Sequence, residues 1–279
     1  MNEALMKGKR GLVMGVANNH SIAWGIAQTL AAHGAELAFT YQGDAFGRRV
    51  KPLAESLGAT LCLPCDVENV ETVDEVFAAI KREWGGIDFL VHAVAYSDKN
   101  ELKGAYAETT RENFTRTMVI SCFSFTEVAR RAAALMKDGG TMITLTFGGA
   151  TRVMPNYNVM GVAKAALEAS ARYLAADFGP RGIRVNALSA GPVRTLAGSG
   201  ITDARLMFNY QKRHSPLKKS VSLDDIGGAA LYLLSPLSGG VTGEVHFVDA
   251  GYNIMSMPRP GELKEQEDNE AEAHREAAQ

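Results

Sequence analysis

Cysteine, long apolar runs and net charge are all scarce in this 279-residue sequence. Its 3 cysteines are too few for a disulfide framework. No apolar segment approaches the length of a membrane span. The formal net charge of −2 provides no attraction to nucleic acid or to anionic lipid. We therefore expect a cytoplasmic protein whose partners include neither nucleic acid nor membrane.

Residue spacing typical of metal ligands is absent as well. Cys62 and Cys65 form a CxxC pair within LCLPCDV, which has the pattern of a strand and its end. Residues three apart on a strand point to opposite faces of the sheet, so this pair is poorly placed to chelate a metal. The 6 histidines show no ligand spacing either. The sequence therefore predicts no metal site.

Apolar and charged residues are present in the proportions of an ordinary globular protein, 46% and 22%. Short aliphatic or β-branched runs alternate with amphipathic segments of helical period, a pattern typical of a parallel sheet with helices on both faces. We predict an α/β fold, a Rossmann-like doubly wound parallel sheet of about seven strands in a single domain. Strands are expected near residues 10–16, 35–40, 60–65, 87–93, 142–147, 183–189 and 244–250, and helices near 21–33, 44–57, 69–83, 112–136, 157–178 and 223–235.

Two segments depart from this alternation. The long connection at residues 192–215 carries apolar side chains, among them Met207 and Phe208. A connection of this length is usually functional, and we interpret it as a substrate-binding loop over an apolar ligand; the alternative is a structural excursion with a short surface helix. Residues 258–279 form an acidic tail with few large apolar side chains, which predicts disorder. The folded domain is expected over residues 1–257.

The first predicted strand runs into a turn, GVANNHSIAWG, that ends at a helix N-terminus. Unpaired backbone N–H groups and the positive end of the helix dipole suit a pyrophosphate there. Gly15 permits a tight turn, Ser21 is placed to cap the helix or contact phosphate, and Gly25 allows helix and sheet to approach closely. Because the GxGxxG motif is absent, an ordinary βα turn stays the alternative at this point.

Two later positions favour a dinucleotide site. Gln42 follows the second predicted strand, where such folds place the group that meets the adenosine ribose, and Asp66 follows the third, within reach of an adenine edge. A neutral glutamine neither accepts from the ribose diol as strongly as a carboxylate nor neutralises a 2′-phosphate. NADH is therefore favoured over NADPH, although Arg48 and Arg49 nearby keep NADPH open.

Tyr157 and Lys164 lie at the start of a segment with helical pattern. A seven-residue step on a helix returns to within about 20° of the same face, so the phenol and the ammonium can face one cleft. A nearby cation favours the phenolate, which would make the tyrosine a better proton relay at neutral pH. The alternative is a packed tyrosine with its hydroxyl in water and a solvated lysine.

Together, the turn GVANNHSIAWGIA, Gln42, the CDV segment, the Tyr-x6-Lys pair and the segment SAGPVRTLA resemble the enoyl-acyl carrier protein reductases of bacterial fatty acid synthesis. That family is a divergent branch of the short-chain dehydrogenase/reductases, and the resemblance runs from about residue 7 to 257. It implies reduction of the trans-2 double bond of enoyl-acyl carrier protein thioesters by hydride transfer from NADH to C3. It also implies a homotetramer whose partner is the acyl carrier protein.

The resemblance implies roles for individual residues. Tyr157 matches the catalytic tyrosine, which would stabilise the enolate, and Lys164 matches the ligand of the nicotinamide ribose. Ser97 matches a substrate contact. The positions that match cofactor contacts are Gly15, Ser21, Ile22, Gln42, Asp66, Val67, Val94, Lys164, Val193, Thr195, Leu196 and Ala197.

Two positions bear on the alternatives. The ordinary branch has a tyrosine four residues before the lysine, where this chain has Met160, so a carbonyl or alcohol oxidoreductase is the alternative enzyme. Many members of the resembling family carry a second tyrosine ten residues before the catalytic one, where this chain has Phe147. We interpret Phe147 as a wall of the substrate pocket. Its presence leaves a catalytically silent dinucleotide-binding regulator as the alternative outside enzymes.

Overall fold

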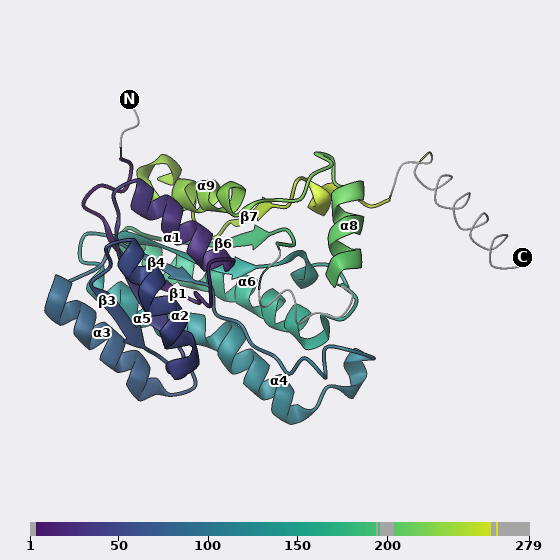
Figure 1. Ribbon diagram of the computed structural model, residues 1–279, viewed down its shortest axis with the longest axis horizontal. Helices are drawn as coiled ribbons and strands as arrows, with labels where there is room; N and C mark the ends of the chain where they lie inside the picture. The colour runs from purple at the N-terminus through teal and green to yellow at the C-terminus, as the bar shows by residue number, and fades with distance from the viewer. Residues whose placement is uncertain (1–3, 194, 196–203, 258–260, 262–279) are drawn as a thin grey trace, which may run out of the picture.

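The structure is a computed structural model that describes residues 4–193, 195, 204–257 and 261. Within this part of the chain the strands form one seven-stranded sheet in which every pair is parallel, in the order β3-β2-β1-β4-β5-β6-β7 (Figure 1). This is the doubly wound arrangement, and it confirms the predicted fold class. The strands are β1 (Arg10–Met14), β2 (Glu36–Tyr41), β3 (Leu61–Pro64), β4 (Phe89–His92), β5 (Gly140–Thr146), β6 (Ile183–Ala190) and β7 (Val245–Val248).

Helices follow most strands, as the alternating pattern predicts. Three of the described helices begin at side-chain caps: Asn69 accepts from the backbone N–H of Glu71, Thr110 accepts from that of Asn113, and Ser222 forms a reciprocal capping box with Asp225. The helices are α1 (Ile22–Ala32), α2 (Gly43–Ser56), α3 (Val70–Trp84), α4 (Arg111–Met118), α5 (Ser124–Leu135), α6 (Asn158–Phe178), α8 (Ala204–His214) and α9 (Leu223–Leu234). Short 3₁₀ turns lie at Tyr106–Glu108, Gly148–Ala150, Gly179–Arg181, Pro236–Ser238 and Tyr252–Ile254.

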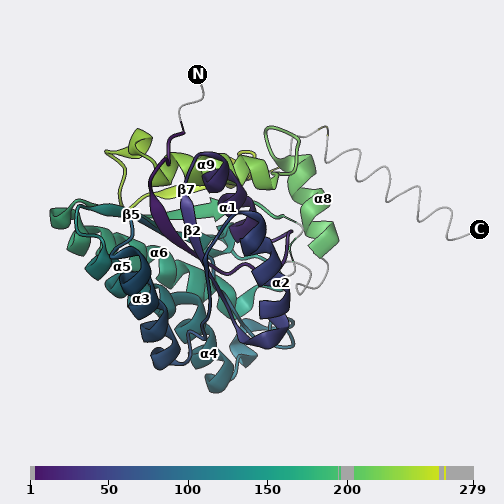
Figure 2. The same ribbon diagram turned by 60° about the vertical axis from the view of Figure 1, so that its left-hand side comes forward.

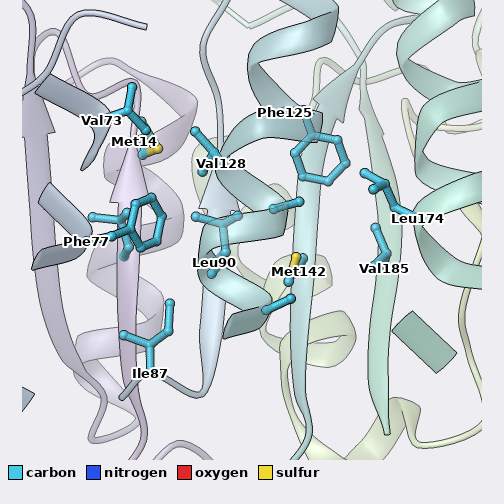
Figure 3. Close-up of a cluster of buried hydrophobic side chains, with 14 of the residues drawn as sticks. Met14, Val73, Phe77, Ile87, Leu90, Phe125, Val128, Met142, Leu174 and Val185 are labelled. Carbon is cyan, nitrogen blue, oxygen red and sulfur yellow. The ribbon is translucent and has the colours of Figure 1, made fainter. Parts of the chain in front are cut away.

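The core has two layers, one on each face of the sheet. Helices α1, α2 and α9 cover one face, and α3, α5 and α6 cover the other (Figure 2). In the second layer, side chains of four adjacent strands meet those of the helices, as Figure 3 shows for Met14, Leu90, Met142, Val185, Phe77, Phe125, Val128 and Leu174. Covering on both faces explains why the central strands are almost continuously apolar.

The CxxC pair divides between these two layers. Cys65 is buried in the layer of α3 and α5, whereas Cys62 packs from the other face against the layer of α1 and α2. This confirms that the two thiols point in opposite directions. Among the residues the structure describes, no group of three or more metal-ligating side chains comes together.

The helix predicted near residues 112–136 is confirmed in its extent, because the chain is helical without a break from Arg111 to Leu135. The prediction missed only a change of helix type in the middle. The structure has α4 and α5 joined by a π-helical turn, η2 (Val119–Phe123). A π turn holds one more residue than an α turn, so it rotates the side chains that follow without breaking the apolar pattern.

Gly25 was expected to allow a helix and the sheet to approach closely, and this was wrong. A Cβ at Gly25 would lie 2.7 Å from Cβ of Leu223, the first residue of α9. This glycine therefore allows α1 to approach another helix, where the sequence analysis expected the sheet.

Helix α8 lies within the long connection after β6, at the end of the molecule opposite α3 (Figure 1). Residues 194 and 196–203 of that connection, and residues 258–260 and 262–279 of the tail, lie outside the described residues. The domain boundary at residue 257 and the disorder of the tail thus stay predictions. In the described part of the chain, no helix is both long enough and apolar enough to cross a bilayer.

Candidate active site

A cavity of about 470 Å³ opens at the carboxyl edge of the sheet, where β1, β2, β3 and β4 end. Open α/β sheets bind their ligands at this edge. Five of the predicted cofactor residues line it: Gly15, Gln42, Asp66, Val67 and Val94.

Gly15 shapes the wall of this cavity. Its φ is +98°, and a Cβ there would lie 2.1 Å from the carbonyl oxygen of Ala93. Only glycine fits a position that combines this backbone angle with so close an approach. The turn after β1 therefore lies directly against the end of β4.

Ser21 holds the same turn closed. Its hydroxyl oxygen accepts hydrogen bonds from the backbone N–H groups of Ala17 and Asn18, each at 3.0 Å. It makes no side-chain cap bond to α1, so the expected capping role was wrong. The hydroxyl oxygen is already engaged by the preceding turn and holds residues 17 and 18 against the start of α1.

Gln42 and Asp66 meet across the mouth of the cavity. The Gln42 Nε2 donates to Asp66 Oδ2 at 3.1 Å, which fixes the orientation of both side chains. Arg48 and Arg49 are exposed on α2 and are absent from the described lining of the cavity. The charged group in contact with Gln42 is the Asp66 carboxylate.

A second cavity of about 380 Å³ adjoins the first, since Ala95 and Tyr96 line both. Met207 and Phe208 of α8 contribute to its wall, as a loop over an apolar ligand requires. Seven of the predicted site residues line it: Ile22, Ser97, Phe147, Tyr157, Lys164, Val193 and Thr195. Among the remaining predicted contacts, Ser21 lines neither cavity, and Leu196 and Ala197 lie outside the described residues.

Tyr157 stands immediately before the first residue of α6 and is only 8% exposed. Its ring packs edge-on against Phe147, with centroids 5.2 Å apart and an interplanar angle of 68°. Burial raises the pKa of the phenol well above its usual range. The expectation that Lys164 would favour the phenolate was wrong, because desolvation of the hydroxyl dominates its environment. Tyr157 therefore keeps its proton across the neutral range.

Lys164 is 6% exposed and reaches the same cavity from the second turn of α6. Its Nζ donates to the carbonyl oxygen of Leu145 in β5 at 2.7 Å. Burial lowers the pKa of its ammonium group to about 8. The prediction that Tyr157 and Lys164 face one cleft is confirmed.

Ser97 lies on the wall of the second cavity, at its junction with α4. Its hydroxyl donates to Asn113 Oδ1 at 3.3 Å and accepts from Thr117 Oγ1 at 3.0 Å. The described partners of this hydroxyl thus belong to the protein itself, and contact with a substrate stays a prediction.

Sequence reasoning missed the residues that build the junction between the cavities. Arg116 stacks over the ring of Tyr96 at 4.5 Å and forms a two-bond ion pair with Glu68, both bonds at 2.9 Å. Ser121 fixes both backbone groups of Tyr96, because its hydroxyl accepts from the Tyr96 N–H and donates to the Tyr96 carbonyl, each at 2.9 Å. No spacing signal points to Ser121, since the π turn brings it there.

Comparisons with known proteins agree with this geometry. The family model described as Enoyl-(Acyl carrier protein) reductase matches residues 15–253. The chain is 71% identical to Enoyl-[acyl-carrier-protein] reductase [NADH] 2 of Rhizobium meliloti, over 91% of this chain and 95% of that protein. Two solved enoyl-acyl carrier protein reductases superimpose on the chain with a TM-score of 0.89. That of Anaplasma phagocytophilum, in complex with NAD, is 56% identical over 91% of this chain and 97% of the other. That of Bacillus cereus, with NADP⁺ and an indole naphthyridinone, is 47% identical over 91% of this chain and 99% of the other. The chain belongs to the family of enoyl-(acyl carrier protein) reductases.

Proposed function

We propose that this chain reduces the trans-2 double bond of enoyl-acyl carrier protein thioesters with NADH, in fatty acid elongation. One observation carries the proposal. Tyr157 and Lys164 line the partly apolar second cavity, which adjoins the first cavity at the dinucleotide-binding edge of the sheet. The 71% identity to a reductase named for NADH supports both the reaction and the cofactor.

The residues of the first cavity fit a dinucleotide. Gly15 lines this cavity and allows the turn after β1 to lie against Ala93, and Gln42 and Asp66 add polar groups to the lining. When bound, NADH supplies the hydride that is added to C3 of the enoyl group. Asp66 beside Gln42 disfavours an added 2′-phosphate, which supports NADH over NADPH.

The hydroxyl of Tyr157 is the donor for the thioester carbonyl oxygen. Among the residues that the structure describes, none forms a hydrogen bond with this hydroxyl, so it is available to the substrate. As negative charge develops on that oxygen, a positioned neutral donor contributes about 3–4 kcal/mol. Lys164 binds the ribose hydroxyls next to the nicotinamide and adds positive potential to the cavity.

The apolar side of the second cavity holds the acyl chain and excludes water. Phe147, Met160 and Leu102 form its fixed wall, and Met207 and Phe208 of α8 form the wall on the loop side. Exclusion of water strengthens the interaction between Tyr157 and the developing charge.

The protein acts on a thioester attached to acyl carrier protein and assembles as a homotetramer in the cytoplasm. Exposed apolar side chains on α6 and the π turn support an assembly of this kind, among them Tyr173 at 76% exposure and Phe123 at 52%. Sedimentation of the purified protein measures the number of copies directly.

The reaction is tested by following NADH absorbance with a crotonyl thioester and with longer 2-enoyl thioesters. Tyr157→Phe is expected to lower kcat by about 10²- to 10³-fold. Tyr106→Phe removes a hydroxyl from an exposed position that lines neither cavity and should leave kcat unchanged, so it is the matched control. NADPH is run in parallel.

Each alternative has its own outcome in this assay. No oxidation of NADH with any enoyl thioester, together with turnover of a 3-ketoacyl thioester, would identify a carbonyl oxidoreductase. Binding of NADH without turnover of either substrate would identify a silent regulator. Unchanged kcat in Tyr157→Phe would remove this residue from the chemistry.

A further inference from the structure

Glu168 is a buried acid that the reaction above does not use. It lies one helical turn after Lys164 on α6 and is 6% exposed. Its Oε1 accepts a hydrogen bond from the Thr146 hydroxyl at 2.7 Å. Burial of a carboxylate is costly unless the charge is paired and hydrogen-bonded.

The end of β5 connects this acid to the active site. Leu145 accepts from Lys164 Nζ at 2.7 Å, and the next residue, Thr146, donates to Glu168 at the same distance. Two consecutive residues of one strand thus hold the ammonium and the carboxyl groups of one helix. Residues four apart on a helix are neighbours, so the two charges share one buried region.

We propose that Glu168 is a positioning residue that keeps the Lys164 ammonium protonated and oriented toward the cavity. The inference rests on the proposed function only for the role of Lys164 in binding the nicotinamide ribose. Glu168 itself does not line the cavity and acts through Lys164.

Electrostatics agree with the geometry. Burial lowers the pKa of Lys164 to about 8, and the influences that oppose this are the charges of Cys122 and Glu168. Burial raises the pKa of Glu168, while the Thr146 hydrogen bond and the charges of Arg172 and Lys164 lower it. Thr146 therefore stabilises the ionised carboxylate, and the carboxylate stabilises the ammonium.

The other titratable groups near Lys164 do not supply a negative charge at neutral pH. Burial lowers the pKa of His92 on β4 to about 3, so this imidazole is neutral. Burial raises the pKa of the Cys122 thiol in the π turn and of the Tyr157 phenol, so both keep their protons. Within this set, the charge that balances Lys164 comes from Glu168.

The direct test is a titration of Lys164 by NMR in the protein without NADH. Lysine labelled with ¹³C at Cε gives one signal per residue, and Lys164→Arg assigns the signal. Glu168→Gln is expected to lower the pKa of Lys164 by about one unit, a tenfold change in its protonation ratio. Asp177→Asn removes one acid from an exposed position on the same helix and should leave the pKa of Lys164 unchanged.

A second variant guards against misfolding. Thr146→Val keeps the acid but removes the donor that stabilises its charge, so it is expected to shift the pKa of Lys164 in the same direction by a smaller amount. A pKa of Lys164 equal to that of the wild type in Glu168→Gln would overturn the proposal. If Glu168→Gln does not fold, an unshifted pKa in Thr146→Val would overturn it.

NADH affinity across pH then separates this inference from the proposed function. We expect Glu168→Gln to lose NADH affinity at a pH about one unit lower than the wild type does, measured by fluorescence titration between pH 6 and pH 10. A lowered pKa of Lys164 with unchanged NADH affinity would support the role of Glu168 and contradict the role of Lys164 in binding the cofactor. An equal loss of affinity at every pH, with no shift of the pKa, would indicate a purely structural role and overturn the proposal.

Discussion

Replacement of Lys164 by methionine should make the protein more stable and less able to bind NADH. The ammonium is 6% exposed, and burial lowers its pKa from 10.5 to about 8. A difference of this size means that the folded state disfavours the charged lysine. Methionine fills a similar volume without that charge.

The magnitude follows from the two pKa values. At about 1.4 kcal/mol for each pH unit between 10.5 and about 8, the charged lysine costs about 3 kcal/mol at pH 7. The hydrogen bond from Nζ to the Leu145 carbonyl and the partner charge that Lys164 provides for Glu168 each offset about 1 kcal/mol of this. We therefore expect Lys164→Met to raise the free energy of unfolding by about 1 kcal/mol at pH 7.

The free energy of unfolding depends on pH because the folded and unfolded states bind different numbers of protons at Lys164. Because the pKa is lower in the folded state, the unfolded state binds more protons between about pH 8 and pH 10.5. The contribution of Lys164 is fully destabilising below pH 8 and disappears as the pH rises toward 10.5. The advantage of Lys164→Met over the wild type should therefore shrink across this window.

Urea titrations at pH 7 and pH 9.5 measure both effects, at one protein concentration because assembly also affects stability. Lys137→Met replaces an exposed lysine and is the control. NADH affinity, measured on the same samples, should fall by at least about tenfold in Lys164→Met. A variant less stable than the wild type at pH 7, or an advantage that does not change with pH, would refute the reasoning.

Three further substitutions test the turn after β1, the packing of α1 on α9 and the wall of the second cavity. Gly15→Ala would place a Cβ 2.1 Å from the Ala93 carbonyl oxygen, so we expect NADH affinity to fall by at least about tenfold in fluorescence titrations; an affinity equal to the wild type would contradict the assigned role of this turn. Gly25→Ala would place a Cβ 2.7 Å from Leu223, so the free energy of unfolding should fall by about 1–3 kcal/mol. The folded protein should keep its NADH affinity. A loss of affinity at unchanged stability would count against the packing explanation. Phe147→Tyr adds a second hydroxyl to the wall beside Tyr157. One added hydrogen bond to the substrate should lower KM for a crotonyl thioester by about fivefold in the NADH assay. An unchanged KM would place position 147 away from the thioester carbonyl group.

The fold was largely predictable because its signals are local. Each strand of the sheet is a short apolar run, and each crossover helix has an amphipathic period, so the elements overlap the predicted ranges. The π turn at Val119–Phe123 was not predictable in this way, since the apolar residues on either side still fit a helix. The contact of Gly25 with Leu223 joins elements almost 200 residues apart, and no local pattern reports it.

The candidate site was predictable in placement and less so in chemistry. The seven-residue step from Tyr157 to Lys164 depends only on helix geometry, and both residues line one cavity as expected. The protonation of Tyr157 depends on how deeply the surrounding chain buries it, including the ring of Phe147. Desolvation is a property of the packed molecule, so the sequence suggested a phenolate where the structure keeps a phenol.

The π turn between α4 and α5 limits how this site can change during evolution. It brings Ser121 against the backbone of Tyr96, and Ser124, at the start of α5, against His92, with an Oγ to Nε2 distance of 2.9 Å. A π turn arises from an α-helix by insertion of one residue, so no series of point substitutions passes smoothly from one to the other. Deletion of a single residue between 119 and 123 would rotate all of α5 by about 100° relative to α4 and remove both contacts at once. Proteins that share this turn should therefore tolerate substitutions between residues 119 and 123 but no insertion or deletion there.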